Sequence, residues 1–261
     1  MVASVSGKMR PLAHPACTIR STPLVSDSSV AVVHADGLFP ACSISIFTVY
    51  DRKSASSKRG FDQKMNKTIR FYWDVGSTNT YFAFHLIRPL AARYGAVIEY
   101  IPFNLGYVFR HHNYALTDEP KAKMKNRKID LMRWANRYDL PFQVPSEFPI
   151  KTSRVLRGAL VMREYDLELP YLEGVFRRYW EEQDASIQSY EGLALTVESL
   201  GVSAETFRAR SESPELQRRF IETTQTALAE GVFGAPTMVV DGQIYWGKDR
   251  MEFVEDHLRA D

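Results

Sequence analysis

The sequence predicts an α/β protein: a thioredoxin-like fold with an all-helical insertion. Three observations support this fold class. A strand, a helix and a second strand follow one another closely between residues 69 and 103. Amphipathic helical patterns fill the middle of the chain, and a helix, two short strands and a last helix close it. The order strand-helix-strand, helical insert, helix-strand-strand-helix is that of a thioredoxin-like fold.

The first predicted unit is strand-helix-strand. Residues 69–75 are rich in β-branched and aromatic side chains and stop at a Gly-Ser-Thr-Asn turn, which predicts a buried strand. Apolar residues recur at helical spacing over 80–94, and Gly95 follows where a helix end favours glycine. Residues 97–103 supply the second strand. A right-handed crossover through the helix makes the two strands parallel.

The middle of the chain is predicted to be helical, with a proline-rich stretch at 141–149. A proline begins the last of these helices and a glycine follows it, which matches the usual helix ends. The helical patterns cover residues 121–138, 153–165, 171–183, 190–200, 204–211 and 214–230.

The C-terminal part returns to strands. Residues 236–242 and 243–246 read as two strands joined at Asp241-Gly242, a dipeptide that tight hairpins favour. Residues 249–259 carry apolar side chains on one face and predict the last helix.

Three parts are therefore expected. Residues 1–65 form a low-complexity extension expected to be disordered, 66–108 and 214–261 form the thioredoxin-like domain, and 109–213 form a helical insertion domain. The first 64 residues hold 11 of the serines and none of the four tryptophans. Three interpretations of this extension stay open: a disordered or mistranslated segment ahead of a start at Met65, a cleaved targeting segment, or a small ordered appendage.

Composition excludes several classes of function. Both cysteines, Cys17 and Cys42, lie in the extension, so thiolate chemistry and thiolate metal sites are excluded from the main domain. A net charge of +2 gives no electrostatic footprint for nucleic acid, and no stretch is apolar enough to span a membrane. Nucleotide-binding and zinc-peptidase motifs are missing from the sequence. We expect no metal, no nucleic acid and no membrane partner.

The turn after the first strand is the first candidate site. Ser77 precedes a helix whose free N–H groups and dipole favour an anion. Its hydroxyl either caps the helix or donates a hydrogen bond to a bound thiolate or carboxylate. A serine without a nearby His-Asp pair is a poor nucleophile, so donation is the more economical chemical role.

Two further candidates lie near the C-terminus. Pro236 starts a strand, where proline is tolerated, and a cis bond before it would turn the backbone of Ala235 toward a peptide-like ligand. Asp249 stands three residues before Glu252, the spacing of a helix-capping arrangement. Its other interpretation is that it holds a ligand ammonium.

Four motifs together resemble the 2-hydroxychromene-2-carboxylate isomerases, relatives of the kappa-class glutathione transferases. The resemblance runs from about Asn66 to the C-terminus. In one respect the chain departs from many relatives, because Thr78 replaces the proline that follows their active-site serine. The motifs are Phe71-Tyr-Trp-Asp-Val-Gly-Ser77, Lys128-Ile-Asp-Leu-Met-Arg-Trp-Ala135, Phe233-Gly-Ala-Pro-Thr237 and Trp246-Gly-Lys-Asp-Arg250.

The resemblance implies glutathione as the cofactor. Ser77 would hold its sulfur as a thiolate, and Ala235, before a cis Pro236, would pair with its cysteinyl backbone. Lys248 and Asp249 would grip the γ-glutamyl end. Asn113 and Lys123, from the insertion, would meet glutathione or the substrate carboxylate, and Phe148 would help to wall the substrate cleft.

The resemblance also implies a reaction, the interconversion of 2-hydroxychromene-2-carboxylate and trans-o-hydroxybenzylidenepyruvate in naphthalene catabolism. The substrate would be a small aromatic carboxylate, the location cytoplasmic, and a homodimer one option for the assembly. Two alternatives stay open. One is a kappa-like glutathione transferase acting on another electrophile, and the other is a non-catalytic thioredoxin-like binding module.

Overall fold

The computed structural model describes residues 67–260, so the predicted extension 1–65 lies outside the described residues. A sheet with the strand order β2-β1-β3-β4 is formed by β1 (Thr68–Trp73), β2 (Val97–Pro102), β3 (Thr237–Val240) and β4 (Gln243–Trp246). β1 and β2 are parallel, and β3 is antiparallel to β1 and β4. Both the strand-helix-strand unit and the hairpin are confirmed. Asp241 and Gly242 have φ values of 47° and 79°, the left-handed values that a tight hairpin needs.

Most helices begin and end close to the predicted residues. One was not predicted: α2 (Leu105–His111) is capped by the side chain of Asn104, which accepts the N–H of Tyr107. The predicted boundary between residues 108 and 109 falls inside α2. The other α-helices are α1 (Thr78–Tyr94), α3 (Lys121–Tyr138), α4 (Ser153–Arg163), α5 (Glu168–Trp180), α6 (Tyr190–Ser199), α7 (Ala204–Ser211), α8 (Pro214–Ala229) and α9 (Met251–Arg259). Short 3₁₀ turns are η1 (Leu116–Asp118), η2 (Ala185–Gln188) and η3 (Lys248–Arg250).

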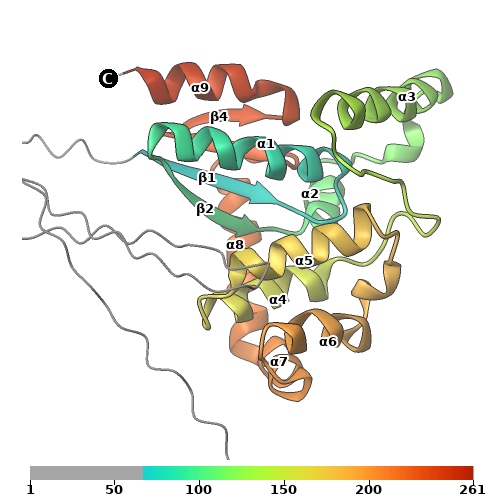
Figure 1. Ribbon diagram of the computed structural model, residues 1–261, viewed down its shortest axis with the longest axis vertical. Helices are drawn as coiled ribbons and strands as arrows, with labels where there is room; N and C mark the ends of the chain where they lie inside the picture. The colour runs from blue at the N-terminus through green and yellow to red at the C-terminus, as the bar shows by residue number, and fades with distance from the viewer. Residues whose placement is uncertain (1–66, 261) are drawn as a thin grey trace, which may run out of the picture. The chain divides into compact units, whose positions relative to one another are not determined.

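Helices cover both faces of the sheet, with α1 and α9 on one face and α8 on the other (Figure 1). The alternation of β1 explains this arrangement, because successive strand residues point to opposite faces. Phe71 and Trp73 join the hydrophobic core beneath α1, whereas Tyr72 joins a second cluster with Ala227 of α8. The central strand β3 is therefore buried along its whole length, whereas the edge strand β4 is mostly exposed.

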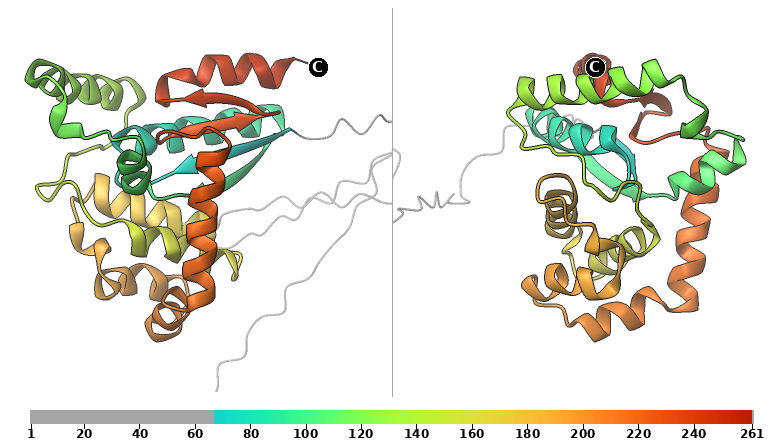
Figure 2. Two further views of the ribbon diagram at one scale, coloured as in Figure 1. Left: turned by 180° about the vertical axis from the view of Figure 1, so that it is seen from behind. Right: turned by 90° about the vertical axis from the view of Figure 1, so that its right-hand side faces the viewer.

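The helical insertion shares its core with the sheet. The ring of Phe176, on α5, lies 5.7 Å from that of Trp73 and stacks on Phe84 of α1 at 4.8 Å. α8 runs from α7 back to the sheet (Figure 2). These aromatic contacts hold the insertion in a fixed place over the end of β1, where the candidate turn begins.

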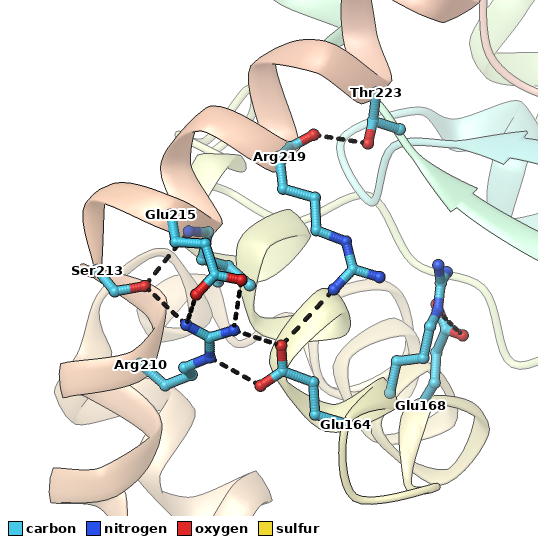
Figure 3. A network of polar contacts seen from close by, with 9 residues as sticks. Glu164, Glu168, Arg210, Ser213, Glu215, Arg219 and Thr223 are labelled. Atoms are coloured by element: carbon cyan, nitrogen blue, oxygen red, sulfur yellow. Dashed lines mark hydrogen bonds and ion pairs between the residues drawn. The ribbon is translucent and has the colours of Figure 1, made fainter.

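A cluster of charged side chains fixes the far end of the insertion (Figure 3). Arg210 of α7 pairs with Glu164, after α4, at 2.7 Å and with Glu215 of α8 at 2.8 Å. Arg219 approaches Glu164 at 3.6 Å. The hydrogen bonds that Arg210 donates to both carboxylates raise its pKa. One guanidinium therefore ties three helices together.

No helix in residues 67–260 is long and apolar enough to cross a membrane. Within the same residues, no group of three or more His, Cys, Asp or Glu side chains is placed to hold a metal ion.

Candidate functional site

Ser77 joins the two motifs that the sequence places 158 residues apart. Its hydroxyl oxygen accepts the N–H of Thr80 at 3.3 Å, so the capping interpretation is confirmed. The same hydroxyl donates to the carbonyl of Ala235 at 2.9 Å, and Ser77 is only 9% exposed. The N–H groups of Thr78 and Asn79, in the first turn of α1, have no acceptor among the described residues. The turn thus presents two free N–H donors beside the Ser77 hydroxyl, whose one proton is donated to the Ala235 carbonyl.

The loop before β3 carries the second part of the site. The peptide bond between Ala235 and Pro236 is cis, as the resemblance implies. The carbonyl of Pro236 accepts the N–H of Gly247 at 3.0 Å, while the N–H of Ala235 donates to no described residue. Gly234 leaves no room for a side chain, because a Cβ there would lie 2.5 Å from Nε1 of Trp246. The loop is therefore held from both sides, and the N–H of Ala235 stays unused.

Lys248 is covered by the insertion. Its Nζ lies 4.6 Å from the ring centre of Trp134 and 3.9 Å from a carboxylate oxygen of Asp130, both on α3. Its side chain is 11% exposed, and burial lowers its pKa. The aromatic ring and the Asp130 carboxylate both favour the charged amine, so they oppose the effect of burial. α3 therefore meets the thioredoxin-like part at the residue expected to grip a ligand.

Asp249 does not cap a helix, so the capping interpretation is wrong. Residues 248–250 form the 3₁₀ turn η3, which puts Arg250 at the N-cap of α9, where no side chain makes a capping bond. The Asp249 carboxylate instead accepts from Arg250 at 2.6 Å and is 53% exposed. Its charge remains accessible to a ligand.

Asn113 and Lys123 are not brought to Ser77. Asn113 follows α2 in a left-handed conformation with φ of 51°, and its side chain bonds to no described residue. Lys123 is exposed on α3 and pairs with Glu119 at 2.9 Å. Hydrogen bonds from Tyr114 and Lys123 lower the pKa of Glu119 to about 2. Neither Asn113 nor Lys123 contacts Ala235 or Asp249 in the structure.

Phe148 lies close to the candidate turn through Trp180. The indole of Trp180 donates to the carbonyl of Val75 at 2.8 Å. Phe148 packs on Trp180 with ring centres 5.8 Å apart and is 39% exposed. Phe148 thus offers an exposed ring beside the residue whose indole binds the turn, which suits the wall of an aromatic pocket.

The sequence analysis missed Asp74, three residues before Ser77. It is 2% exposed and accepts three hydrogen bonds, from Gly76, Leu105 and Thr152. Burial raises its pKa from 3.8 to about 6. One sequence signal could have revealed Asp74: it directly follows three aromatic strand residues, and a position next to them is expected to be buried.

Comparison with known proteins places these residues in a family. The family model described as the DSBA-like thioredoxin domain matches residues 68–259. A 2-hydroxychromene-2-carboxylate isomerase of Sphingobium xenophagum is 34% identical over 200 residues, which cover 74% of this chain and 99% of that protein. A glutathione S-transferase kappa 1 of Caenorhabditis elegans is 27% identical over 209 residues, covering 73% of this chain and 90% of that protein.

A solved structure shows the same architecture. The structure of a 2-hydroxychromene-2-carboxylate isomerase superposes on this one with a TM-score of 0.64 and 28% identity, covering 73% of this chain and 94% of that one. The thioredoxin-like fold with added helices is therefore confirmed.

Proposed function

The chain belongs to the 2-hydroxychromene-2-carboxylate isomerases, within the DSBA-like thioredoxin domain family, and we propose that it is a glutathione-dependent isomerase. Its proposed reaction interconverts 2-hydroxychromene-2-carboxylate and trans-o-hydroxybenzylidenepyruvate. The observation that carries the proposal is the contact between the Ser77 hydroxyl and the Ala235 carbonyl beside two unpaired N–H groups. These groups can donate hydrogen bonds to an anionic sulfur, and the main chain of Ala235 can pair with a peptide.

The residues present fit glutathione along its length. At the sulfur end, the free N–H groups of Thr78 and Asn79 and the positive end of α1 favour a thiolate. In the middle, the unused N–H of Ala235 can donate to a peptide carbonyl. At the γ-glutamyl end, the exposed Asp249 carboxylate suits an ammonium and Lys248 suits a carboxylate.

Ser77 has the central part in the proposed chemistry. When bound, glutathione supplies a thiolate that adds reversibly to the conjugated substrate, so that a double bond becomes a rotatable single bond before the sulfur leaves. Ser77 turns its hydroxyl proton from the Ala235 carbonyl toward the sulfur and stabilises its charge. The chain needs no cysteine of its own for this, and no electron is gained or lost overall.

The substrate and the setting follow from the same site. Phe148, which packs on the buried Trp180, offers exposed aromatic surface for a flat bicyclic carboxylate. We place the protein in the cytoplasm, where reduced glutathione is abundant. Asn113 and Lys123 remain proposed contacts to glutathione or the substrate carboxylate.

The test is turnover of 2-hydroxychromene-2-carboxylate by the full chain, followed by absorbance with and without glutathione. We expect turnover only with glutathione, and an unchanged glutathione concentration at the end. The kappa-class relatives favour one alternative, a transferase, which would consume glutathione in proportion to product. Turnover that proceeds equally without glutathione would refute the proposal.

Two variants test the site assignment. Asp249→Ala should weaken glutathione binding, measured by calorimetry, because the ligand ammonium loses its partner. Asp256→Ala is the matched control, since Asp256 is an exposed aspartate of α9 that pairs with Arg259 at 3.2 Å. Equal affinities in the two variants would remove Asp249 from the site.

A further inference from the structure

Asp74 is a buried carboxylate held by hydrogen bonds alone. Oδ1 accepts the N–H of Gly76 at 2.9 Å, and Oδ2 accepts the N–H of Leu105 and the hydroxyl of Thr152, both at 3.1 Å. Within residues 67–260, no Lys, Arg or His side chain forms an ion pair with it. Burying an unpaired charge is costly, so a carboxylate kept in such a place has a use that an apolar residue could not supply.

The three donors come from three separate segments. Gly76 lies in the turn before Ser77, Leu105 begins α2, and Thr152 directly precedes α4. Asp74 therefore connects the turn to the start of α2 and to the start of α4. A change in the ionisation of one side chain reaches all three segments at once.

Every residue of the turn is tied down around Asp74. The N–H of Ser77 donates to the main-chain carbonyl of Asp74 at 3.1 Å. The carbonyl of Val75 accepts the indole N–H of Trp180. Gly76 has little space for a side chain, because a Cβ would lie 3.0 Å from Cγ2 of Thr152. The orientation of the Ser77 hydroxyl and of the N–H groups after it depends on this turn.

We propose that Asp74 is a positioning residue for the glutathione site: its carboxylate fixes the turn that presents Ser77 and the free N–H groups of α1. This inference rests on the proposed function. Asp74 touches neither Ser77 Oγ nor the loop at Pro236, so it acts through the main chain of the turn.

Protonation of Asp74 stabilises the fold as a whole, because it removes a buried charge. Within the fold, where the group stays buried, it should nevertheless loosen the turn. A neutral carboxyl group carries a hydrogen on one oxygen, so it can no longer accept all three donors equally well. Burial raises the Asp74 pKa to about 6, within reach of ordinary assays. The other titratable group near it is Tyr179 of α5, whose phenol donates to the carbonyl of Glu147 and whose pKa is raised by burial. Tyr179 therefore stays neutral while Asp74 titrates.

The first test uses the protein without ligand. The N–H groups of Gly76 and Leu105 both donate to the Asp74 carboxylate. Their hydrogen exchange, measured by NMR, therefore reports on the state of this carboxylate. After correction for intrinsic exchange, we expect their protection in the wild type to fall as the pH drops through about 6. In Asp74→Asn, protection should be lower and constant over that range. Constant protection in the wild type would overturn the role of the carboxylate.

The second test is steady-state turnover with glutathione. We expect Asp74→Asn to raise KM for glutathione about tenfold and to lose the acid limb of the wild-type pH profile. Asp184→Asn is the matched control, because Asp184 also accepts the N–H of the residue two positions ahead, at 2.9 Å, but lies in the insertion. It should keep the wild-type KM and pH profile.

Thr152→Val removes one donor and leaves the charge, so it serves if Asp74→Asn fails to fold. It should raise KM for glutathione less than Asp74→Asn does. Glutathione-dependent turnover with wild-type KM and pH profile in both variants would overturn the Asp74 inference alone. Wild-type turnover without any need for glutathione would instead overturn the proposed function, and the amide-exchange result would stand separately.

Discussion

The contribution of the Ser77 side chain to the free energy of unfolding can be measured by comparison with Ser189, which makes similar hydrogen bonds. Ser189 caps α6 in the same way, accepting the N–H of Gly192 at 3.0 Å and donating to the carbonyl of Ser186 at 3.0 Å. Both serines thus make one capping bond and one bond to a carbonyl. They differ in that the bond from Ser77 to Ala235 is buried and spans the fold, whereas the bond from Ser189 is local and exposed.

The two alanine variants should therefore differ in stability. Loss of an N-cap costs about 1 kcal/mol in either case. In Ser189→Ala, water can replace the hydroxyl at the exposed carbonyl of Ser186. In Ser77→Ala, the buried carbonyl of Ala235 loses its donor, which adds about 1–3 kcal/mol. The free energy of unfolding should fall by about 2–4 kcal/mol for Ser77→Ala and by about 1 kcal/mol for Ser189→Ala.

Urea unfolding followed by tryptophan fluorescence measures both values, and the four tryptophans all lie within residues 67–260. The same samples assayed with glutathione should show reduced kcat for Ser77→Ala alone. If the two variants lost stability to within about 0.5 kcal/mol of each other, the contact between Ser77 and Ala235 would not contribute as described. Wild-type kcat in folded Ser77→Ala would refute the thiolate role.

Three further predictions concern packing, charge and pH. Gly158→Ala should cost about 1–3 kcal/mol by urea unfolding, because its Cβ would lie 2.4 Å from Oη of Tyr171, and an unchanged midpoint would show that this core yields easily. Arg210→Met should lower the urea midpoint more than Arg208→Met does. Arg208 is more exposed than Arg210, and its ion pairs are longer, 3.5 and 3.6 Å. The reverse order of midpoints would show that the ion pairs of Arg210 do not stabilise the fold. Because burial raises the Asp74 pKa from 3.8 to about 6, the folded chain binds its proton more tightly than the unfolded chain does. Ionisation of Asp74 should therefore lower the wild-type free energy of unfolding by up to about 3 kcal/mol as the pH rises between those values. Urea unfolding at several pH values should show that this decrease is missing in Asp74→Asn.

The sequence determined the order and type of most elements. Helical periodicity placed α3 and α7 at their observed ends, and the dipeptide Asp241-Gly242 placed the hairpin. These signals are local, since they depend on which face of a helix is apolar and which residues tolerate positive φ. α2 was missed because it is short and buries Val108 alone, so its sequence has little periodicity to detect.

The candidate site was only partly readable from the sequence. The motifs around Ser77, Pro236 and Asp249 were candidates because each has its own turn or helix signal, and the structure brings Ser77 into contact with Ala235. The capping interpretation of Asp249 was wrong because a 3₁₀ turn moved the start of α9 by two residues. Asp74 was missed because its partners Leu105 and Thr152 are 31 and 78 residues away along the chain.

The sequence by itself therefore determined the thioredoxin-like order, the helical insertion and the segments that carry the site. The tertiary structure decided that the Ser77 hydroxyl meets the Ala235 carbonyl, that Trp134 covers Lys248, and that Asp74 is buried without a counter-charge. The physical reason is range: secondary structure follows from neighbours a few residues apart, whereas hydrogen-bond partners and burial are set by segments that meet only after the core has packed.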